Sequence, residues 1–221
     1  MTTDLLIMTL NEIDGVKKIM PQIKKEWVDN ILVVDGGSTD GTVEELEKMG
    51  FNVIRQKIKG YGGAILSGIE QTNCDNIVLF SPDGNHQPDE IRQLVEKIKE
   101  GYDQIVISRF GKNSVNLDAG LVDSFGNKMF TFLVNVFFGG SMTDPLTGCR
   151  IIKRKAMNEI KMNALEMDST TQMSIRGLKL KQKIGSIEGN EGERIGGERK
   201  MKPLNVGGQI SYQIIKEFIF W

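Results

Sequence analysis

The sequence predicts an α/β protein with a mostly parallel, Rossmann-like central sheet flanked by helices. In the first half of the chain, short runs rich in Ile, Val, Leu and Phe alternate with longer stretches whose apolar residues recur at helical spacing. Strands that alternate with helices form parallel crossover units covered on both faces. The 221 residues contain no internal repeat and no linker, so we expect a single domain.

Each element of the first half is defined by a short apolar run or by an amphipathic stretch. Strands are predicted at residues 5–10, 31–35, 51–55, 77–80 and 105–108, and helices at 15–26, 42–49, 63–72 and 88–101. The strands are bounded by Gly, Asp or Asn, which is typical of buried strands. In the last helix, Ile91, Leu94 and Ile98 share one face while Asp89 and Arg92 lie on the other.

The pattern is less regular after Arg109. We predict a mobile loop over 110–120, helices over 122–138 and 167–178, strands over 148–152 and 181–188, a charged glycine-rich loop over 189–202 and an amphipathic helix over 203–221. Apolar stripes on the helices at 122–138 and 210–221 are more typical of core than of a membrane-facing surface, although the terminal aromatic residues also suit a bilayer interface.

The composition excludes several classes of protein. Lys and Arg number 28 against 29 Asp and Glu, so the field of the whole protein does not attract nucleic acid or anionic lipid. Cys74 and Cys149 are too few for a disulfide framework and favour a reduced, cytoplasmic compartment. We expect no signal peptide and no spanning helix, and at most peripheral membrane contact. The oligomeric state is not indicated.

Glycine is the one unusual component, with 25 residues in 221, against a usual share of about 7%. Many of these glycines fall where predicted strands end. Ligands of parallel sheets bind at the carboxyl ends of the strands. We therefore expect the glycines to line the rim of one crevice, where substitution by Ala harms binding more than folding.

Polar residues follow the first three strands. Asn11 and Glu12 come after the first, and Asp35 ends the second and opens the run VVDGGSTDGT, which includes Gly37. That run is also compatible with a simple capped turn between a strand and a helix. The third turn, KIKGYGGA, places Gly60 and Gly62 before a helix, where the backbone can approach an anion. Alone, this is a weak signal.

The fourth strand leads into LFSPDGNHQPDE, which suggests a metal site. Asp83 at the strand end, with Asn85 two residues on, suits Mg²⁺ or Mn²⁺, because diphosphate oxygens and water complete the octahedron. His86 beside Pro88 is more typical of a structural side chain than of a ligand.

The order of these motifs resembles glycosyltransferase family 2, in the branch of dolichyl-phosphate mannose and glucose synthases. The resemblance covers about residues 5–200 and rests on TLNE, VVDGGSTDGT, KGYGGAILSGI, VLFSPDGNHQPDEI, VISRF, TDPLTGCR and RIGGERK. It implies a GT-A fold and inverting transfer of a hexose from GDP-mannose, UDP-glucose or UDP-GlcNAc to dolichyl (polyprenyl) phosphate. Residues 1–109 would then bind the donor and 110–202 would form the acceptor side.

The resemblance also implies roles for individual residues. The donor would contact Asn11, Glu12, Asp35, Gly37, Gly60, Gly62, Ser81 and Asp83, the metal would bind Asp83 and Asn85, and the acceptor would contact Arg109, Ser124 and Arg150. Arg109, Arg194 and Lys200 would stabilise the leaving diphosphate. Arg194, Arg199 and Lys200 lie in a segment similar to the family's R-x-x-G-E-S-K flap.

The sequence departs from the family pattern at informative positions. Ser81 replaces the first Asp of the metal-binding signature, Gly36 replaces the second Asp of the VVDD turn, and no arginine precedes the helix that begins near Ser124. The loss of the arginine weakens the assignment to mannose. The loss of the acid at position 81 makes cation binding depend more on Asp83 and on the diphosphate.

The acceptor class depends on Asp144 of MTDPLTGCR. A hydroxyl acceptor needs a general base, whereas a lipid phosphate already carries charge near neutral pH. Asp144 would be that base for a glycan or other hydroxyl acceptor, and would instead orient Arg150 or a loop if the acceptor were a phosphate. Both alternatives stay open on the sequence, as does a nucleotide-sugar-binding homologue disabled by Ser81.

Overall fold

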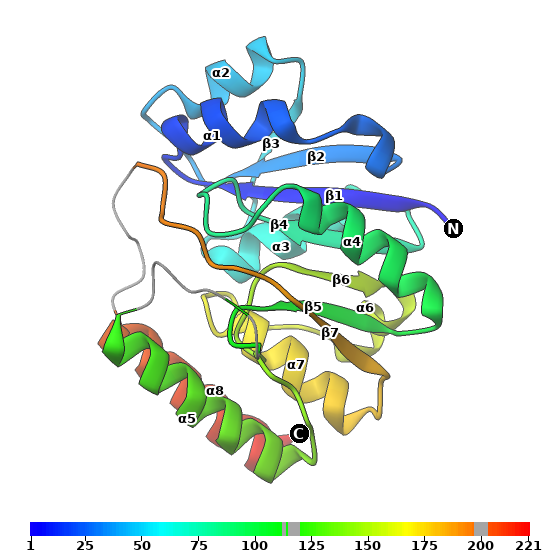
Figure 1. The fold of residues 1–221 in the computed structure, drawn as a ribbon, viewed down its shortest axis with the longest axis vertical. Coiled ribbons are helices and arrows are strands. Elements are labelled where there is room, and N and C mark those ends of the chain that lie inside the picture. Colours follow the sequence, from blue (N-terminus) through cyan, green and yellow to red (C-terminus); the bar gives the residue numbers. More distant parts are fainter. Residues whose placement is uncertain (112–113, 115–119, 197–202) are drawn as a thin grey trace.

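A seven-stranded sheet forms the centre of the protein, in a computed structural model that describes residues 1–111, 114, 120–196 and 203–221 (Figure 1). The strand order is β3-β2-β1-β4-β6-β5-β7, and only β6 runs antiparallel to its neighbours. The strands are β1 Thr3–Thr9, β2 Asn30–Asp35, β3 Asn52–Arg55, β4 Asn76–Phe80, β5 Gln104–Ser108, β6 Arg150–Lys153 and β7 Ile184–Glu188. The predicted α/β class with a mostly parallel sheet is confirmed.

Helices cover both faces of this sheet. They are α1 Ile13–Ile19, α2 Thr42–Lys48, α3 Tyr61–Glu70, α4 Asp89–Lys97, α5 Leu121–Phe138, α6 Arg154–Ile160, α7 Ser169–Lys179 and α8 Pro203–Phe220. Alternate residues of each strand point to opposite faces. In β1, Leu5 and Ile7 therefore pack against α1, α2 and α4, while Leu6 and Met8 pack in the core that α3, α6 and α7 cover.

Helices α5 and α8 form a further layer against α7, at the end of the molecule opposite α2 (Figure 1). A small apolar core joins the three helices through Val134, Ile175 and Ile214. A buried ion pair joins α7 to α8, with Arg176 Nη2 2.8 Å from Glu217 Oε1. These contacts give the C-terminal helix a fixed position on the domain.

The structure differs from the prediction in its short elements. The helix expected at 15–26 ends at Ile19 and is followed by two 3-10 turns, because Pro21, the second residue of the turn Met20–Gln22, has no N–H to continue the α-helical hydrogen bonds. Helix α6 was not predicted, and β6 begins two residues later than expected. The loop predicted over 110–120 and the segment 197–202, which contains Arg199 and Lys200, lie wholly or largely outside the described residues.

Candidate active site

The polar side chains singled out in the sequence gather at one edge of the sheet. Strands β1, β2, β4, β5 and β7 all end at this edge, and the antiparallel β6 begins there. The strand ends place Glu12, Asp35, Asp83 and Arg109 along the edge. The segment before β6 adds Asp144. The segment after β7 returns to the same edge and adds Glu191 and Arg194.

The turn after β2 is built around the Asp35 carboxylate. Its oxygens accept hydrogen bonds from the backbone N–H groups of Gly37 (2.7 Å) and Ser38 (2.9 Å). Asn11 ties this turn to the loop after β1, since its side-chain oxygen accepts from Thr39 N at 2.8 Å. In the structure, the side chains of Asp35 and Asn11 therefore cap the turn between β2 and α2, as the capped-turn interpretation expects. Their predicted contact with the donor stays a prediction.

Asp83 lies at the centre of a second set of contacts, beside half-buried Ser81 at the end of β4. Asp83 Oδ1 accepts from Asn85 N at 3.1 Å, and Asp83 Oδ2 lies 3.6 Å from Arg194 Nη1. Arg194 also pairs with Glu12. Burial, the largest influence on the Asp83 carboxyl, raises its pKa above the ordinary value. The charge of Arg194, 3.6 Å away, therefore does not outweigh the effect of burial on this carboxyl.

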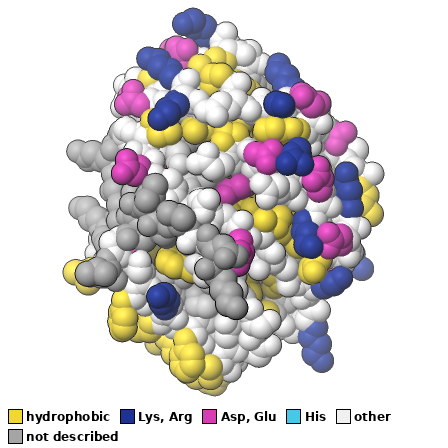
Figure 2. All heavy atoms as spheres, in the orientation of Figure 1, with side chains coloured by type: hydrophobic (Ala, Val, Ile, Leu, Met, Phe, Trp, Pro, Cys, Tyr) yellow, Lys and Arg dark blue, Asp and Glu magenta, His cyan; other side chains and the backbone are white. Residues whose placement is uncertain are grey.

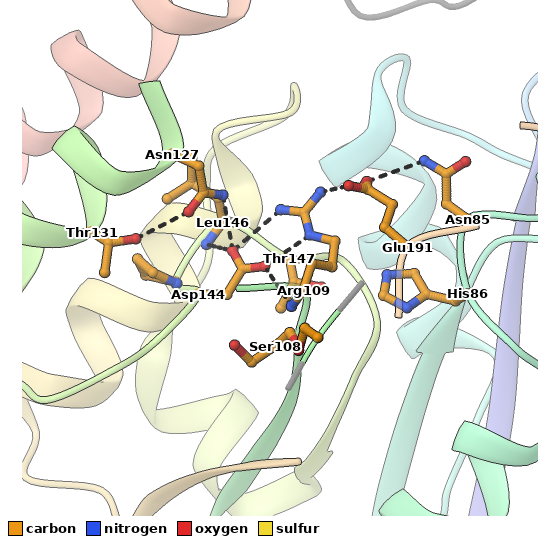
Figure 3. Close-up of polar contacts among 12 residues, drawn as sticks. Asn85, His86, Ser108, Arg109, Asn127, Thr131, Asp144, Leu146, Thr147 and Glu191 are labelled. Atoms are coloured by element: carbon orange, nitrogen blue, oxygen red, sulfur yellow. Dashed lines mark hydrogen bonds and ion pairs between the residues drawn. The ribbon is translucent and has the colours of Figure 1, made fainter. Parts of the chain in front are cut away.

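Arg109 and Asp144 form a buried ion pair in the middle of the edge (Figure 3). The guanidinium donates from Nε (2.8 Å) and Nη2 (3.2 Å) to the two carboxylate oxygens, and Asn127 Nδ2 donates at 3.1 Å. Asp144 is 0% exposed. Burial alone would raise the pKa of Asp144, but the charge and hydrogen bonds of Arg109 outweigh it and hold that pKa below the ordinary value.

Glu191 is a site residue that the sequence analysis missed. Its Oε1 accepts from Arg109 Nη1 at 3.0 Å and from Asn85 Nδ2 at 3.4 Å, so it lies between the two (Figure 3). The only signal in the sequence was its place in the charged loop at 189–202. Asn127 was also missed, because it is one of several polar residues on α5 and no local pattern distinguishes it as the buried one.

Two predicted acceptor residues lie in different surroundings. Ser124 is half-buried on α5, one turn before Asn127. Arg150 is 0% exposed, and its guanidinium donates to Thr147 O and to Ser174 Oγ. Because no part of it reaches solvent, we do not retain Arg150 as an acceptor-binding residue. Of the two orienting roles expected for Asp144, the one toward Arg150 is wrong, because the hydrogen-bonding arginine partner of Asp144 is Arg109. The other, toward a loop, agrees with the hydrogen bond that Asp144 accepts from Leu146 N.

The third-turn glycines serve packing. A Cβ on Gly60 would lie 2.2 Å from Leu165 O, and a Cβ on Gly62 would lie 2.2 Å from Ala164 O. The expectation that Ala there harms binding more than folding is therefore wrong. We expect Gly62→Ala to lower the free energy of unfolding by roughly 1–3 kcal/mol, as overpacking does, measured by urea denaturation. Gly208→Ala is the control, because this glycine lies in a helix without a positive φ and nothing lies within 4 Å of its Cβ.

His86 belongs to a separate buried cluster below this edge. His86 Nδ1 lies 2.9 Å from Glu90 Oε2, and Cys149 completes a group whose ligand atoms lie within 4.8 Å of one another. Since the His86 and Glu90 side chains already bond to each other, the cluster fits the structural role expected for His86.

The residues present fit a divalent cation near Asp83. The directly paired network of the edge contains four carboxylates, of Glu12, Asp83, Asp144 and Glu191, and two guanidiniums, of Arg109 and Arg194. In the described part of the chain this network therefore has two more negative than positive groups, and the carboxylates of Glu12, Asp144 and Glu191 are buried. A hard cation with oxygen ligands would balance that excess.

Comparison with known families identifies the kind of protein to which this edge belongs. The family model described as "Glycosyl transferase family 2" matches residues 4–161. The chain belongs to glycosyltransferase family 2. It is a transferase, and its sheet with the flanking helices is the GT-A fold.

Individual relatives are similar over most of the chain. Glycosyltransferase AglJ of Haloferax volcanii is 24% identical over 96% of this chain and 70% of its own length. A dolichyl-phosphate hexose transferase of the same organism is 25% identical over 94% of this chain and 90% of its own. A glucosyl-3-phosphoglycerate synthase from Mycobacterium tuberculosis, solved with Mn²⁺, UDP and glucosyl-3-phosphoglycerate, has a TM-score of 0.72 at 22% identity, covering 99% of this glycosyltransferase and 78% of that chain.

Proposed function

We propose that this family 2 glycosyltransferase moves a hexose, with inversion, from a nucleotide-diphosphate sugar to a polyprenyl phosphate. A phosphate oxygen of the lipid attacks C1 of the sugar, the bond from C1 to the diphosphate oxygen breaks, and the nucleoside diphosphate leaves. The relative named as a dolichyl-phosphate hexose transferase supports the acceptor class. The two free, buried cysteines fit a reduced compartment.

The state of Asp144 is the observation that carries this proposal. A hydroxyl acceptor requires a base that can take its proton. Asp144 is fully buried, accepts hydrogen bonds from Arg109, Asn127 and Leu146 N, and has a lowered pKa, so it is a weak base with no free access. A phosphate acceptor needs no base and instead needs a cation, which Arg109 supplies at the same place.

The donor and the metal are assigned to the neighbouring strand ends. Asp83 and Asn85 would hold Mg²⁺ or Mn²⁺, which, when bound, neutralises charge on the departing diphosphate. Arg194 lies beside Asp83 and would bring a second cation to the same oxygens. The turn of Asn11 and Asp35, which lies at the carboxyl ends of β1 and β2, would receive the nucleoside.

An apolar surface on α5 and α8 supports a lipid acceptor. We call it the α5–α8 face, and it consists of Phe125, Phe132, Val136, Phe137, Tyr212, Ile215, Phe218, Ile219 and Phe220, each at least 48% exposed. The two helices meet at Phe137 and Phe218, whose ring centres are 5.3 Å apart. Yellow side chains gather at the lower left of the molecule, where α5 and α8 lie (Figures 1 and 2). Exposed apolar area of this kind marks an interaction surface.

This face is proposed to rest on the membrane that carries the acceptor, with the helices parallel to its plane. None of the described helices has the length and apolar character required to cross a bilayer. The α5–α8 face therefore corrects the expectation that both apolar stripes are mainly core: each helix buries one side against α7 and exposes another.

Charge placed on the α5–α8 face should weaken membrane binding. The double variant Phe132→Asp with Ile215→Asp should bind phosphatidylcholine vesicles at least about tenfold less tightly, because each side chain contributes roughly 1.5–3 kcal/mol when buried. Co-sedimentation measures this. The matched control is Gln22→Asp with Asn52→Asp, which adds the same charge at exposed positions near the opposite end. Equal binding by both variants would contradict the assignment.

A paired acceptor assay tests the function itself. Purified protein with Mn²⁺ and radiolabelled GDP-mannose, UDP-glucose or UDP-GlcNAc is given polyprenyl phosphate and, separately, polyprenol of the same chain length. Label should enter the phosphate lipid only. Label in polyprenol would favour the hydroxyl alternative, and tight nucleotide-sugar binding without transfer to either lipid would indicate a binding homologue without activity.

A further inference from the structure

Glu191 connects the residues assigned to the metal with those assigned to the acceptor. One carboxylate oxygen, Oε1, accepts from Asn85 on one side and from Arg109 on the other (Figure 3). The other oxygen, Oε2, is buried and has no hydrogen-bond partner among the described residues, and the whole residue is 3% exposed. A buried carboxylate oxygen without a partner is costly and therefore calls for a ligand.

The charges around Glu191 are unbalanced in a way that opposes the proposed reaction. Arg109 is paired with both Asp144 and Glu191, so this group of three carries a net charge of −1 and repels an anionic acceptor. The position assigned to the metal, in contrast, has too little negative charge to hold a divalent cation well. It offers Asp83 and the neutral Asn85, while position 81 carries a serine.

We propose that Glu191 exchanges partners when a divalent cation binds. Its carboxylate leaves Arg109 Nη1 and becomes a ligand of the cation beside Asp83 and Asn85, in place of the acid missing at position 81. Arg109 then keeps Asp144 alone, and the N–H that Glu191 releases is free for the acceptor phosphate. Acceptor binding thereby depends on prior loading of the metal. This inference rests on the proposed function.

Because the backbone around Glu191 is fixed by hydrogen bonds, the exchange of partners requires a movement of the Glu191 side chain only. The segment that carries Glu191 is bonded to the metal turn at two points, with Gly192 N donating to Asn85 O (3.0 Å) and Ile195 N donating to Asp83 O (2.8 Å). Glu191 is therefore held beside Asn85 whichever partner its carboxylate takes. A divalent cation at this position would attract the Glu191 carboxylate more strongly than the N–H of the Asn85 amide attracts it.

Titration with Mn²⁺ alone, followed by calorimetry, tests the ligand role. Glu191→Gln keeps the size of the side chain and removes its charge, and we expect it to weaken Mn²⁺ binding by about 10- to 100-fold, the range for groups that support a metal site. Glu193→Gln is the control from the same segment, since that side chain is exposed. Wild-type affinity in Glu191→Gln would overturn the proposal.

A double-mutant cycle tests the exchange itself. Arg109→Lys keeps the positive charge for Asp144 but lacks the fork that reaches two carboxylates at once. It should therefore release Glu191 and tighten Mn²⁺ binding in the otherwise wild-type protein, with no gain in the Glu191→Gln background. Equal gains in both backgrounds, or no gain in either, would show that Glu191 is not shared between Arg109 and the metal.

A structure of the wild-type protein with Mn²⁺ gives a result that does not depend on how well the variants fold. Glu191 should lie on the ion and away from Arg109, and an ion bound while Glu191 still pairs with Arg109 would overturn the proposal. None of these measurements includes a sugar or a lipid. A failure of sugar transfer is therefore distinguishable from a failure of the exchange.

Discussion

Asp83→Asn should abolish nearly all sugar transfer while leaving the fold intact. Asp83 is the carboxylate at the end of β4 that would hold the divalent cation, and a cation on the departing diphosphate stabilises the transition state by several kcal/mol. A loss of that size corresponds to a fall in kcat/KM on the order of 10³-fold. Since burial raises the pKa of Asp83, its neutralisation removes a destabilising charge and should not harm folding.

Two readouts separate this effect from general damage. Calorimetry should show no Mn²⁺ binding by Asp83→Asn, and thermal denaturation should give a Tm at or above that of the wild type. Asp89→Asn is the matched control, because Asp89 lies six positions along on α4 and forms an exposed pair with Arg92. If Asp83→Asn transferred sugar at the rate of Asp89→Asn, the claim that a cation held by Asp83 is required for transfer would be contradicted.

Asp144→Asn should produce the largest loss of stability. It removes the fully buried partner of an ion pair whose arginine side chain is 15% exposed, and leaves Arg109 with Glu191. Breaking such a pair costs roughly 3–5 kcal/mol in the free energy of unfolding, and urea denaturation measures it. Glu70→Gln breaks the exposed Lys57–Glu70 pair and should cost less than about 1 kcal/mol. Equal, small losses in the two variants would contradict the structural role of Asp144.

The pH dependence of this loss follows from the lowered pKa of Asp144. A carboxyl whose pKa is lower in the folded state stabilises the protein above its unfolded pKa, about 3.9, and that contribution is lost as the pH falls through the folded value. The difference in unfolding free energy between wild type and Asp144→Asn should therefore be full at pH 6 and shrink below about pH 4. If this difference in unfolding free energy instead grew as the pH fell, the pKa of Asp144 would be raised in the folded protein and not lowered.

Much of the fold was predictable because its signals are local. The apolar run at 77–80 and the polar turn beginning at Ser81 define a strand and its end whatever surrounds them, and the structure has β4 at Asn76–Phe80. The direction of β6 was not predictable in the same way. A short strand buried on both faces has the same apolar pattern whether it runs parallel or antiparallel to its neighbours.

Several residues of the candidate site were identified one by one from the sequence, but Glu191 and Asn127 were missed and the pairing of the site residues was not predictable. Arg109 was identified from its place after a strand, whereas its bond to Glu191 joins positions 82 residues apart, which no local pattern encodes. Arg150 shows the reverse error. The family resemblance suggested an acceptor contact for Arg150, but the packing of β6 between β4 and β5 buries this side chain completely.

The most direct test of the central claim is phosphorus and proton NMR of the product formed from polyprenyl phosphate, Mn²⁺ and the preferred nucleotide sugar. The account predicts that the lipid phosphomonoester signal is replaced by that of a phosphodiester, with nucleoside diphosphate released in equal amount and the anomeric configuration inverted relative to the donor. An unchanged lipid phosphate, with the sugar found on a hydroxyl group or free in water, would contradict it.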